Sequence, residues 1–352
     1  MAGRQSRPSI REVAQEAGVS VTTVSQALNG KGRLDIATRE RVVEIARRMG
    51  YHPNRNARSL RSGRTGSIAL LLPSAPGVRR LPIEIDFYLE LLTSSVDAAF
   101  QHDQALVHLP PLESAGDLRR FAIDGAIVVD PVRDDPRVAM FHELDLPLVT
   151  VGNHDARPGD RWAVIADSAG TTRTMCDHMV SRGARRVGML TVDIDWSWFT
   201  DGIEAYQGWC AENEQEPVLV RAHRDKQETS MRAAAGELLA WPDPPDGVFA
   251  PAQWLASGLL TVAGERGISV PGDMLIGVGV DSGLARGSRP ALTAVDLNAP
   301  LMAKQAVDLL MEQIEGKPGT ARFRVVATTL LPRESTSGLR VRPRGPESSG
   351  GS

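Results

Sequence analysis

The sequence has few cysteines and no long apolar stretch, and both absences exclude classes of protein. Among its 352 residues only Cys176 and Cys210 carry thiols, which is too few for a disulfide framework or a four-thiolate zinc site. No apolar run reaches the roughly 18 residues that span a bilayer, and the first eight residues lack the apolar stretch of a secretory signal. We therefore expect a cytoplasmic protein, and its length predicts two or three domains.

Patterns that support catalysis or metal binding are also missing. The seven histidines have no paired metal-ligand spacing, and no Gly-x-Ser-x-Gly nucleophile elbow occurs. Gly277-Val-Gly279 is not followed by a helix with a phosphate-binding lysine, so it is a weak nucleotide signal. Asp193 and Asp195 form a lone acidic pair, a pattern that is more often solvated than metal-bound. We therefore expect no enzyme activity, no cofactor and no metal site.

Charge is divided unevenly along the chain. The formal net charge is −3, but residues 1–65 hold 13 Lys or Arg and five Asp or Glu, a net +8. The remainder holds 27 basic and 38 acidic residues, a net −11. A basic module joined to an acidic body is typical of proteins that bind nucleic acid through the basic part. The alternative is a chance cluster of bases on a solvated face.

The basic segment has the pattern of three short helices. Ser9 and Glu12 form a capping box for a first helix, which Gly18 ends. Ser20 caps a second helix after a three-residue turn, and Asp35 caps a third. The second helix would bury one side and leave a polar side free to enter the major groove of DNA. The alternative is a three-helix module that packs without nucleic acid, which the charge distribution disfavours.

Three segments together resemble the opening of a lac repressor family (LacI/GalR) regulator, namely Ile10–Asn29, Thr38–Val42 and Gly50–Leu60. The resemblance continues more thinly through the rest of the chain. It implies a DNA-binding transcriptional regulator, most often a repressor. The residues that it places on DNA are Ser9, Ser20, Val21, Thr22, Thr23, Ser25, Gln26, Asn29, Arg33, Asn54, Arg55, Ala57, Arg58, Leu60 and Arg61.

Residues 53–64 are predicted to form a hinge helix that folds on DNA. Pro53 and Asn54 begin it and Gly63 ends it, and a helix of about eight residues is unstable alone in water. Two copies packed over DNA would order it. The resemblance implies that Leu60 enters the minor groove as an apolar wedge, with the neighbouring arginines on phosphates. The alternative is that Leu60 packs under the body.

The predicted recognition helix departs from the family at one position. Members of the family typically carry arginine, which reads guanine, where this chain has Gln26. Glutamine suits the N6 and N7 edge of adenine instead. We therefore expect an operator half-site with an altered base at that position.

From residue 66 onward apolar strands alternate with helices, which predicts an α/β fold. The expected strands are 67–72, 105–109, 125–129, 146–151, 187–190, 218–221, 247–249 and 275–280. The expected helices are 86–102, 115–121, 138–144, 202–213, 229–239 and 256–266. Right-handed crossovers then give two doubly wound parallel sheets. This matches the two-lobed periplasmic-binding-protein-like core that the resemblance implies.

The domain boundaries follow from these patterns. The lobes are expected to exchange the chain near Gly183, Asp296 and Val325. The predicted parts are a helix-turn-helix domain (1–52), a hinge (53–65), a first lobe (66–183 with 296–324), a second lobe (184–295 with 325–339) and a tail (340–352). The tail is rich in Pro, Gly, Ser and Arg without leucine heptads, so we expect disorder there and no coiled coil for a tetramer.

Ligands of such sheets bind at the carboxyl ends of strands, so two facing lobes should form a cleft for an effector. By resemblance, the candidate effector-binding residues are Asp130, Asp167, Asp201, Ala205, Gln253, Trp254 and Asp281. Each aspartate has the alternative of capping a turn or a helix.

Some effector positions depart from the family. Ala205 stands where the family has an arginine, and Ala252-Gln253 replaces an Asn-Asp pair. Loss of the arginine disfavours an anionic effector. Trp196, Trp198 and Trp254 could stack on a ring or a sugar face, or they belong to the core. The pocket is thus rebuilt for an unusual ligand or binds none.

Three functions remain open. The first is a repressor that binds a near-palindromic operator as a homodimer, with affinity set by a sugar or related metabolite. The second is a regulator of the same architecture with a vestigial pocket. The third, disfavoured by the basic arm, is a cytoplasmic solute-binding protein or a sugar-handling enzyme.

Overall fold

A computed structural model of the protein divides the chain into two compact units, Met1–Gly66 and Ser67–Ser352. The structure describes residues 8–28, 34–51, 64–73, 85–152, 162–223, 227–317 and 321–340. The predicted hinge helix over 53–64 and the tail beyond Arg340 lie outside these ranges, except for Arg64.

The first unit is a bundle of three helices. These are α1 (Ile10–Ala17), α2 (Val21–Leu28) and α3 (Ile36–Arg48). The predicted capping box is present, because the Ser9 hydroxyl accepts a hydrogen bond from the Glu12 N–H and the Ser9 N–H donates to the Glu12 carboxylate. Gly18 ends α1 in the left-handed conformation (φ 64°), which glycine adopts without steric cost. One valine from each helix, at positions 13, 24 and 42, is fully buried in the small core.

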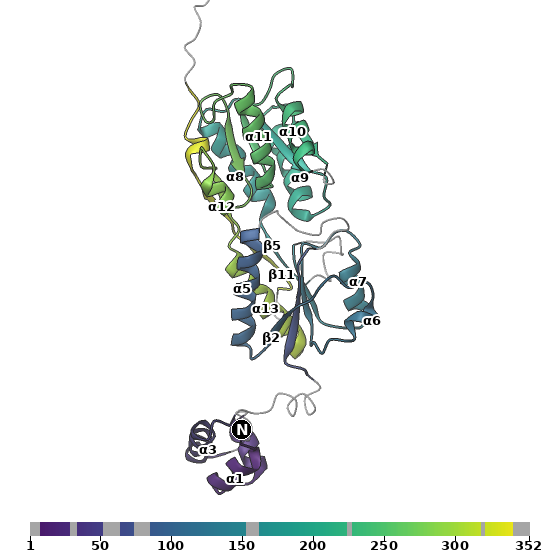
Figure 1. Ribbon diagram of the computed structural model, residues 1–352, viewed down its shortest axis with the longest axis vertical. Helices are drawn as coiled ribbons and strands as arrows, with labels where there is room; N and C mark the ends of the chain where they lie inside the picture. The colour runs from purple at the N-terminus through teal and green to yellow at the C-terminus, as the bar shows by residue number, and fades with distance from the viewer. Residues whose placement is uncertain are drawn as a thin grey trace, which may run out of the picture. The chain divides into compact units, whose positions relative to one another are not determined.

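The second unit begins with a six-stranded parallel sheet in the order β11-β5-β4-β3-β1-β2. Its strands are β1 (Ser67–Leu71), β2 (Ala105–His108), β3 (Ala126–Val129), β4 (Leu148–Val151), β5 (Ala163–Ala166) and β11 (Phe323–Val326). The helices that cover it are α5 (Ile85–Gln101) and α13 (Ala299–Glu315) on one face, and α6 (Ala115–Leu118) and α7 (Pro136–Glu143) on the other (Figure 1).

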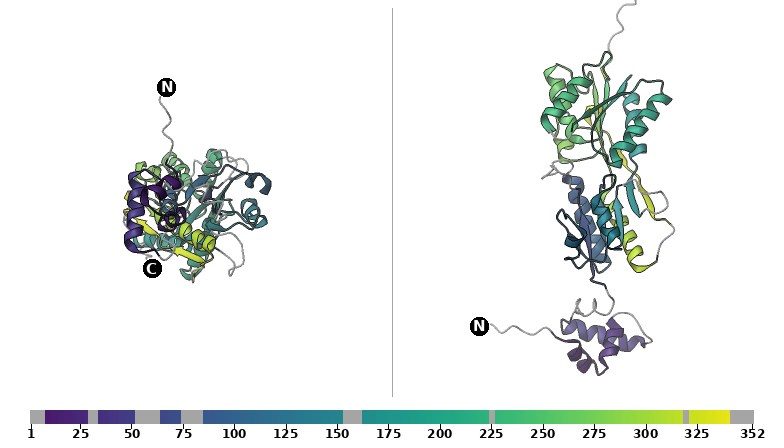
Figure 2. Two further views of the ribbon diagram at one scale, coloured as in Figure 1. Left: turned by 90° about the horizontal axis from the view of Figure 1, so that it is seen from below. Right: turned by 90° about the vertical axis from the view of Figure 1, so that its right-hand side faces the viewer.

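A four-stranded parallel sheet in the order β7-β6-β8-β9 forms the second lobe. Its strands are β6 (Val187–Val192), β7 (Val218–Ala222), β8 (Gly247–Ala250) and β9 (Leu275–Val278). Its helices are α8 (Ser168–Ser181), α9 (Ser197–Glu212), α10 (Gln227–Leu238), α11 (Gln253–Glu265) and α12 (Gly283–Gly287). Figure 2 shows this lobe and the first joined end to end by several chain segments.

The chain passes between the lobes near Asp167, where β5 ends and α8 begins. Helix α8 packs mainly against α9 and also touches β6 and β8, so it belongs to the second lobe. This first crossing was predicted near Gly183 instead, because neither β5 nor α8 was expected from the sequence. The later crossings lie between β10 (Ala294–Asp296) and α13, and between β11 and β12 (Thr329–Leu331). A 3-10 turn at Glu334–Thr336 then returns to the second lobe.

The predicted fold class is confirmed, with two parallel doubly wound sheets following the helical unit. Parallel strands buried on both faces explain the near-continuous apolar runs in the sequence. Among the helices that the structure describes, none has both the length and the apolar character needed to cross a membrane.

Candidate functional site

Helix α2 presents one outward face in the first unit. The Ser20 hydroxyl accepts from the Thr23 N–H at 3.0 Å and so caps the helix. Val24 and Ala27 turn into the core, which leaves Val21 and Thr22 exposed and Gln26 half-buried on the other side. We call these three outward residues the recognition face. Val21 is 38% exposed at the start of the helix, where its side chain suits the methyl group of thymine.

The predicted DNA-contacting residues fall into two groups. The first group lies in or beside α1 and α2. Ser9 and Ser20 cap these helices, Val21, Thr22 and Gln26 form the recognition face, and Thr23 and Ser25 flank it. The remaining predicted contacts lie outside the described residues and stay predictions: Asn29, Arg33, Asn54, Arg55, Ala57, Arg58, Leu60 and Arg61.

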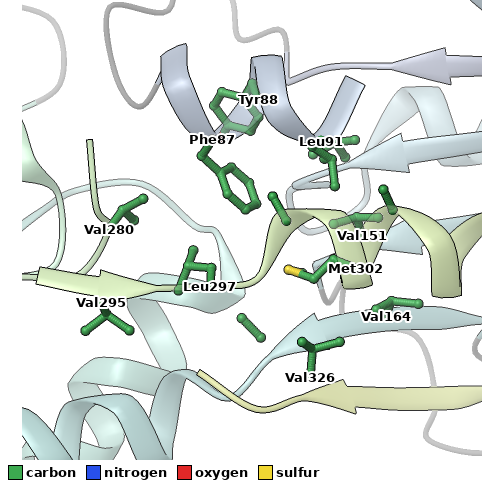
Figure 3. Close-up of a cluster of buried hydrophobic side chains, with 14 of the residues drawn as sticks. Phe87, Tyr88, Leu91, Val151, Val164, Val280, Val295, Leu297, Met302 and Val326 are labelled. Carbon is green, nitrogen blue, oxygen red and sulfur yellow. The ribbon is translucent and has the colours of Figure 1, made fainter. Parts of the chain in front are cut away.

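A cleft between the two lobes of the second unit encloses about 560 Å³ of empty space, part of which is open to solvent. It lies at the carboxyl ends of β3, β4, β5 and β6. The residues that line it are Phe87, Asp130, Val151, Gly152, Ile165, Ala166, Ser168, Trp196, Ser197, Trp198, Phe199, Asp201, Val280, Leu297 and Met302. Figure 3 shows the Phe87 ring directed from α5 toward Leu297 and Met302. The lining combines apolar and aromatic side chains with a few polar groups, as in sites that bind small organic ligands.

Asp130 is a pre-positioned carboxylate in this cleft. It follows β3 with a left-handed backbone (φ 42°), and its Oδ2 accepts from the Tyr88 hydroxyl at 2.6 Å. Gly152 (φ 93°) allows the close approach, because a Cβ atom there would lie 2.9 Å from Asp130 Oδ1. Burial raises the pKa of Asp130 to about 6, against the opposing effects of Tyr88 and Arg137. Strained backbones of this kind persist where the surrounding structure enforces them, often at functional sites.

The structure separates the predicted effector residues. Asp130 and Asp201 line the cleft, as do Trp196 and Trp198. Asp167 instead caps α8 by accepting from the Gly170 N–H at 2.8 Å.

Four other predicted residues do not line it. Ala205 is buried within α9, and Gln253 at the start of α11 accepts from the Ser282 hydroxyl. The Trp254 ring packs against the core of the second lobe. Asp281 pairs with Arg333 at 2.7 Å and with Arg286 at 2.6 Å, since the fold brings both guanidinium groups to it. Burial alone would raise the pKa of Asp281, but these arginines hold the pKa below its ordinary value.

Helix α5 contributes to the cleft, which was not predicted from the sequence. Phe87 lines the cleft, Tyr88 holds Asp130, and Asp86 accepts from the Gly283 N–H of the second lobe at 2.5 Å. The two aromatic residues at the start of a helix that follows a buried strand were the available signal. A second interlobe contact, Arg133 to Asp195 at 3.3 Å, also joins the two lobes.

Replacing Asp130 with asparagine is expected to stabilise the unliganded protein at neutral pH. A carboxyl whose pKa is raised on folding favours the folded state below its unfolded pKa of 3.8, and this advantage is lost as pH rises through about 6. The neutral amide of asparagine does not ionise and so keeps this advantage. We expect its free energy of unfolding to be about 1–3 kcal/mol higher than that of the unmodified protein near pH 7.5. The titratable and charged groups that act on Asp130 are Tyr88, which donates to it, and Arg137. The measurement is thermal unfolding of both proteins near pH 7.5 and near pH 4.5. If the variant and the unmodified protein differ in Tm by the same amount at both pH values, the prediction is wrong.

A helix-turn-helix unit joined to a two-lobed body with a ligand-sized cleft defines the class of ligand-responsive, DNA-binding transcriptional regulators. Residues 9–54 match the model of bacterial regulatory proteins of the lacI family, and residues 176–336 match the periplasmic binding protein-like domain. These two matches confirm the resemblance to the lac repressor family that the sequence indicated, because the chain carries a lacI-family DNA-binding domain and, after it, a periplasmic binding protein-like domain.

Similar proteins match along most of their length. The HTH-type transcriptional regulator CelR of Thermobifida fusca is 29% identical over 343 residues, which are 94% of this chain and 99% of CelR. The ribose operon repressor of Halalkalibacterium halodurans is 28% identical over 346 residues, 94% of this chain and 97% of that repressor.

Solved structures show the same fold. A CelR–cellobiose complex is 27% identical, with a TM-score of 0.69 over 94% of this chain and 100% of that one. A lac repressor dimer bound to operator and the anti-inducer ONPF is 19% identical, with a TM-score of 0.72 over 94% of this chain and 99% of that one.

Proposed function

We propose that this protein is a repressor that binds a near-palindromic operator as a homodimer and responds to a small molecule in the interlobe cleft. The observation that carries the proposal is the recognition face of α2, which stands free of the core in a segment with a net charge of +8. Basic side chains supply affinity for phosphates, and the outward side chains of the helix supply base recognition. The protein acts in the cytoplasm, on the nucleoid, and not as an enzyme.

An apolar stripe on α5 supports the homodimer. Leu89, Val96 and Phe100 are 56%, 46% and 78% exposed, and their spacing of seven and four residues places them on one face of the helix. Leu284 of α12 is also exposed and follows Gly283, whose N–H contacts Asp86 at the start of α5. A contiguous exposed apolar surface of this kind is typical of a protein–protein interface. A two-fold dimer would then present two copies of α2 to two half-sites.

The cleft supports the effector. Its carboxylates and its aromatic rings suit a polyhydroxylated ligand or a related metabolite. The solved CelR complex contains cellobiose, and we propose a sugar-like ligand in the corresponding cleft of this chain. Ligand binding changes lobe closure and thereby the population of the DNA-binding state.

The domain division that we propose is the one predicted from the sequence, with a helix-turn-helix domain, a hinge, two lobes and a tail. Only the first passage of the chain between the lobes is placed differently, near Asp167.

Selection of operators from a random duplex library by the full-length protein tests this function. We expect enrichment of a near-palindromic site whose affinity falls steeply with salt, because phosphate contacts release counterions. A metabolite library added to the selected duplex then tests the effector. Failure to bind any duplex at low salt would refute the DNA-binding role, and binding unaffected by any metabolite would favour a vestigial pocket.

Gln26 is expected to read an A·T pair in the selected half-site. The Gln26→Arg variant should change the preferred base at that position to guanine, because arginine pairs with guanine O6 and N7. The discrimination at this position should be about 1–3 kcal/mol for each protein. The measurement is operator selection with both proteins, with Gln15→Arg on the exposed side of α1 as a control for the added charge. Selection of guanine by the unmodified protein would contradict this assignment.

A further inference from the structure

The carboxylate of Asp130 lacks a neutralising cation in the described part of the protein. The nearest guanidinium, that of Arg137, is already paired with Asp135, at 2.7 Å from Nη2 to Oδ2. It also donates to the backbone carbonyls of Leu72 and of Asp130 itself. Tyr88 provides one hydrogen bond to Asp130 but no charge. A half-buried carboxylate without a close counter-charge is unfavourable, so a ligand that brings a positive charge would relieve this cost.

The other lining groups accept hydrogen bonds more than they donate them. Asp201 is a second carboxylate, and the Ser168 hydroxyl already donates to the Trp198 carbonyl at 2.7 Å. None of the described residues that line the cleft is Lys, Arg or His. The Trp198 indole N–H is a buried donor that has no hydrogen-bond partner among the described residues. A ligand rich in hydrogen-bond donors therefore suits the carboxylates of the lining better than one rich in acceptors.

The aromatic side chains favour the same kind of ligand. Phe87, Trp196 and Trp198 line the cleft together with Asp130, and the Trp196 ring is stacked on Phe199 at 6.0 Å between ring centroids. The face of an aromatic ring carries partial negative charge and attracts cations, tryptophan most strongly. The Asp130 carboxylate and the aromatic rings therefore both attract an ammonium group.

We propose that the cleft binds a hydroxylated ligand that carries a protonated amine, such as an amino sugar, and that its ammonium group docks on Asp130. This inference rests on the proposed function, because it assumes that the cleft holds the effector. A neutral sugar can also stack on the aromatic rings, but it leaves the Asp130 charge unpaired. An anionic ligand is repelled by the carboxylate of Asp130.

Isothermal titration of the full-length protein with two matched pairs tests this inference. One pair is cellobiose and the β-1,4-linked disaccharide of glucosamine, and the other is glucose and glucosamine, so that within each pair only hydroxyl and amine differ. In at least one pair the amine should bind about tenfold tighter, which corresponds to about 1.4 kcal/mol. The same amine should release the selected operator at lower concentration than its neutral partner does.

Two variants separate a docking role from a structural one. Asp130→Asn should abolish the preference for the amine and remain folded, because asparagine tolerates a positive φ and its amide oxygen still accepts from Tyr88. Asp193→Asn removes an exposed acid that does not line the cleft, and it should keep the preference.

Equal or tighter binding of the neutral sugars overturns this inference but leaves the proposed function intact, as does an amine preference that survives Asp130→Asn. Binding of neither pair at millimolar concentration overturns the amine docking and also counts against the effector. Operator binding by the same preparation still reports on the DNA-binding function separately.

Discussion

Arg137→Met is expected to lower the free energy of unfolding by about 3–5 kcal/mol, because it leaves a buried charge unpaired. The side chains of Arg137 and Asp135 are only 7% and 3% exposed. Arg137 joins the end of β1 to α7, since its Nη1 donates to the Leu72 carbonyl at 2.8 Å while Nε and Nη2 bind Asp135. Methionine fills a similar volume but satisfies none of these acceptors. The measurement is equilibrium denaturation of the two proteins.

The pH dependence of this loss provides a second observation. Burial by itself raises the pKa of Asp135, but hydrogen bonds from Arg137 outweigh it and hold the pKa below its ordinary value. Because the pKa of Asp135 is lower in the folded state, its carboxylate stabilises the folded protein above the unfolded pKa of 3.8. This stabilisation is lost as the pH falls and Asp135 is protonated. The difference between the two proteins should therefore shrink as Asp135 becomes protonated in acid.

Arg133→Met is the matched control for this substitution. Arg133 is four residues away and pairs with Asp195, but both side chains are more than half exposed. Surface pairs contribute about 0–1 kcal/mol, so this variant should remain close to the unmodified protein. Equal losses from the two substitutions would refute the buried-pair argument.

Phe100→Glu is expected to convert the protein to a monomer and to reduce operator affinity by about 100-fold or more, because two linked recognition helices bind far more tightly than one. Phe100 is the most exposed large apolar side chain described, at 78%. A charge there would be buried without a partner in the proposed dimer, whereas the monomer exposes it to water without cost. Sedimentation analysis and operator titration of the same preparation measure both effects.

The matched control is Phe121→Glu, another exposed phenylalanine of the first lobe. It follows α6, on the face of the sheet opposite α5, and its side chain is 37% exposed. This variant should keep both the dimer and the operator affinity. A Phe100→Glu protein that sediments as the unmodified one does would remove α5 from the interface.

Much of the fold could be predicted from the sequence because its signals are local. The Ser9–Glu12 capping box and Gly18 determine the ends of α1 within a few residues. The apolar runs of β1, β3 and β9 are buried throughout their length, as expected for parallel strands.

Other elements were missed for identifiable reasons. Helix α13 has Asn298 as its cap and Gly316 at its end, signals that were present but not used. Helix α8 carries Gly170, Thr171 and Thr172 in its first turns, and these residues have low helix propensity. Packing on α9 stabilises it instead, and such tertiary support leaves little trace in the local sequence.

The sequence by itself determined the DNA-binding character of this protein, because charge, caps and the outward face of α2 all arise within one short segment. The tertiary structure decided the chemistry of the cleft. Asp281 aligned with an effector-binding position, yet the fold pairs it with Arg333, while Asp130 is held by Tyr88 from a different helix. Whether a carboxylate is neutralised or left available depends on which distant side chains the fold brings within hydrogen-bond distance, and no local pattern encodes that.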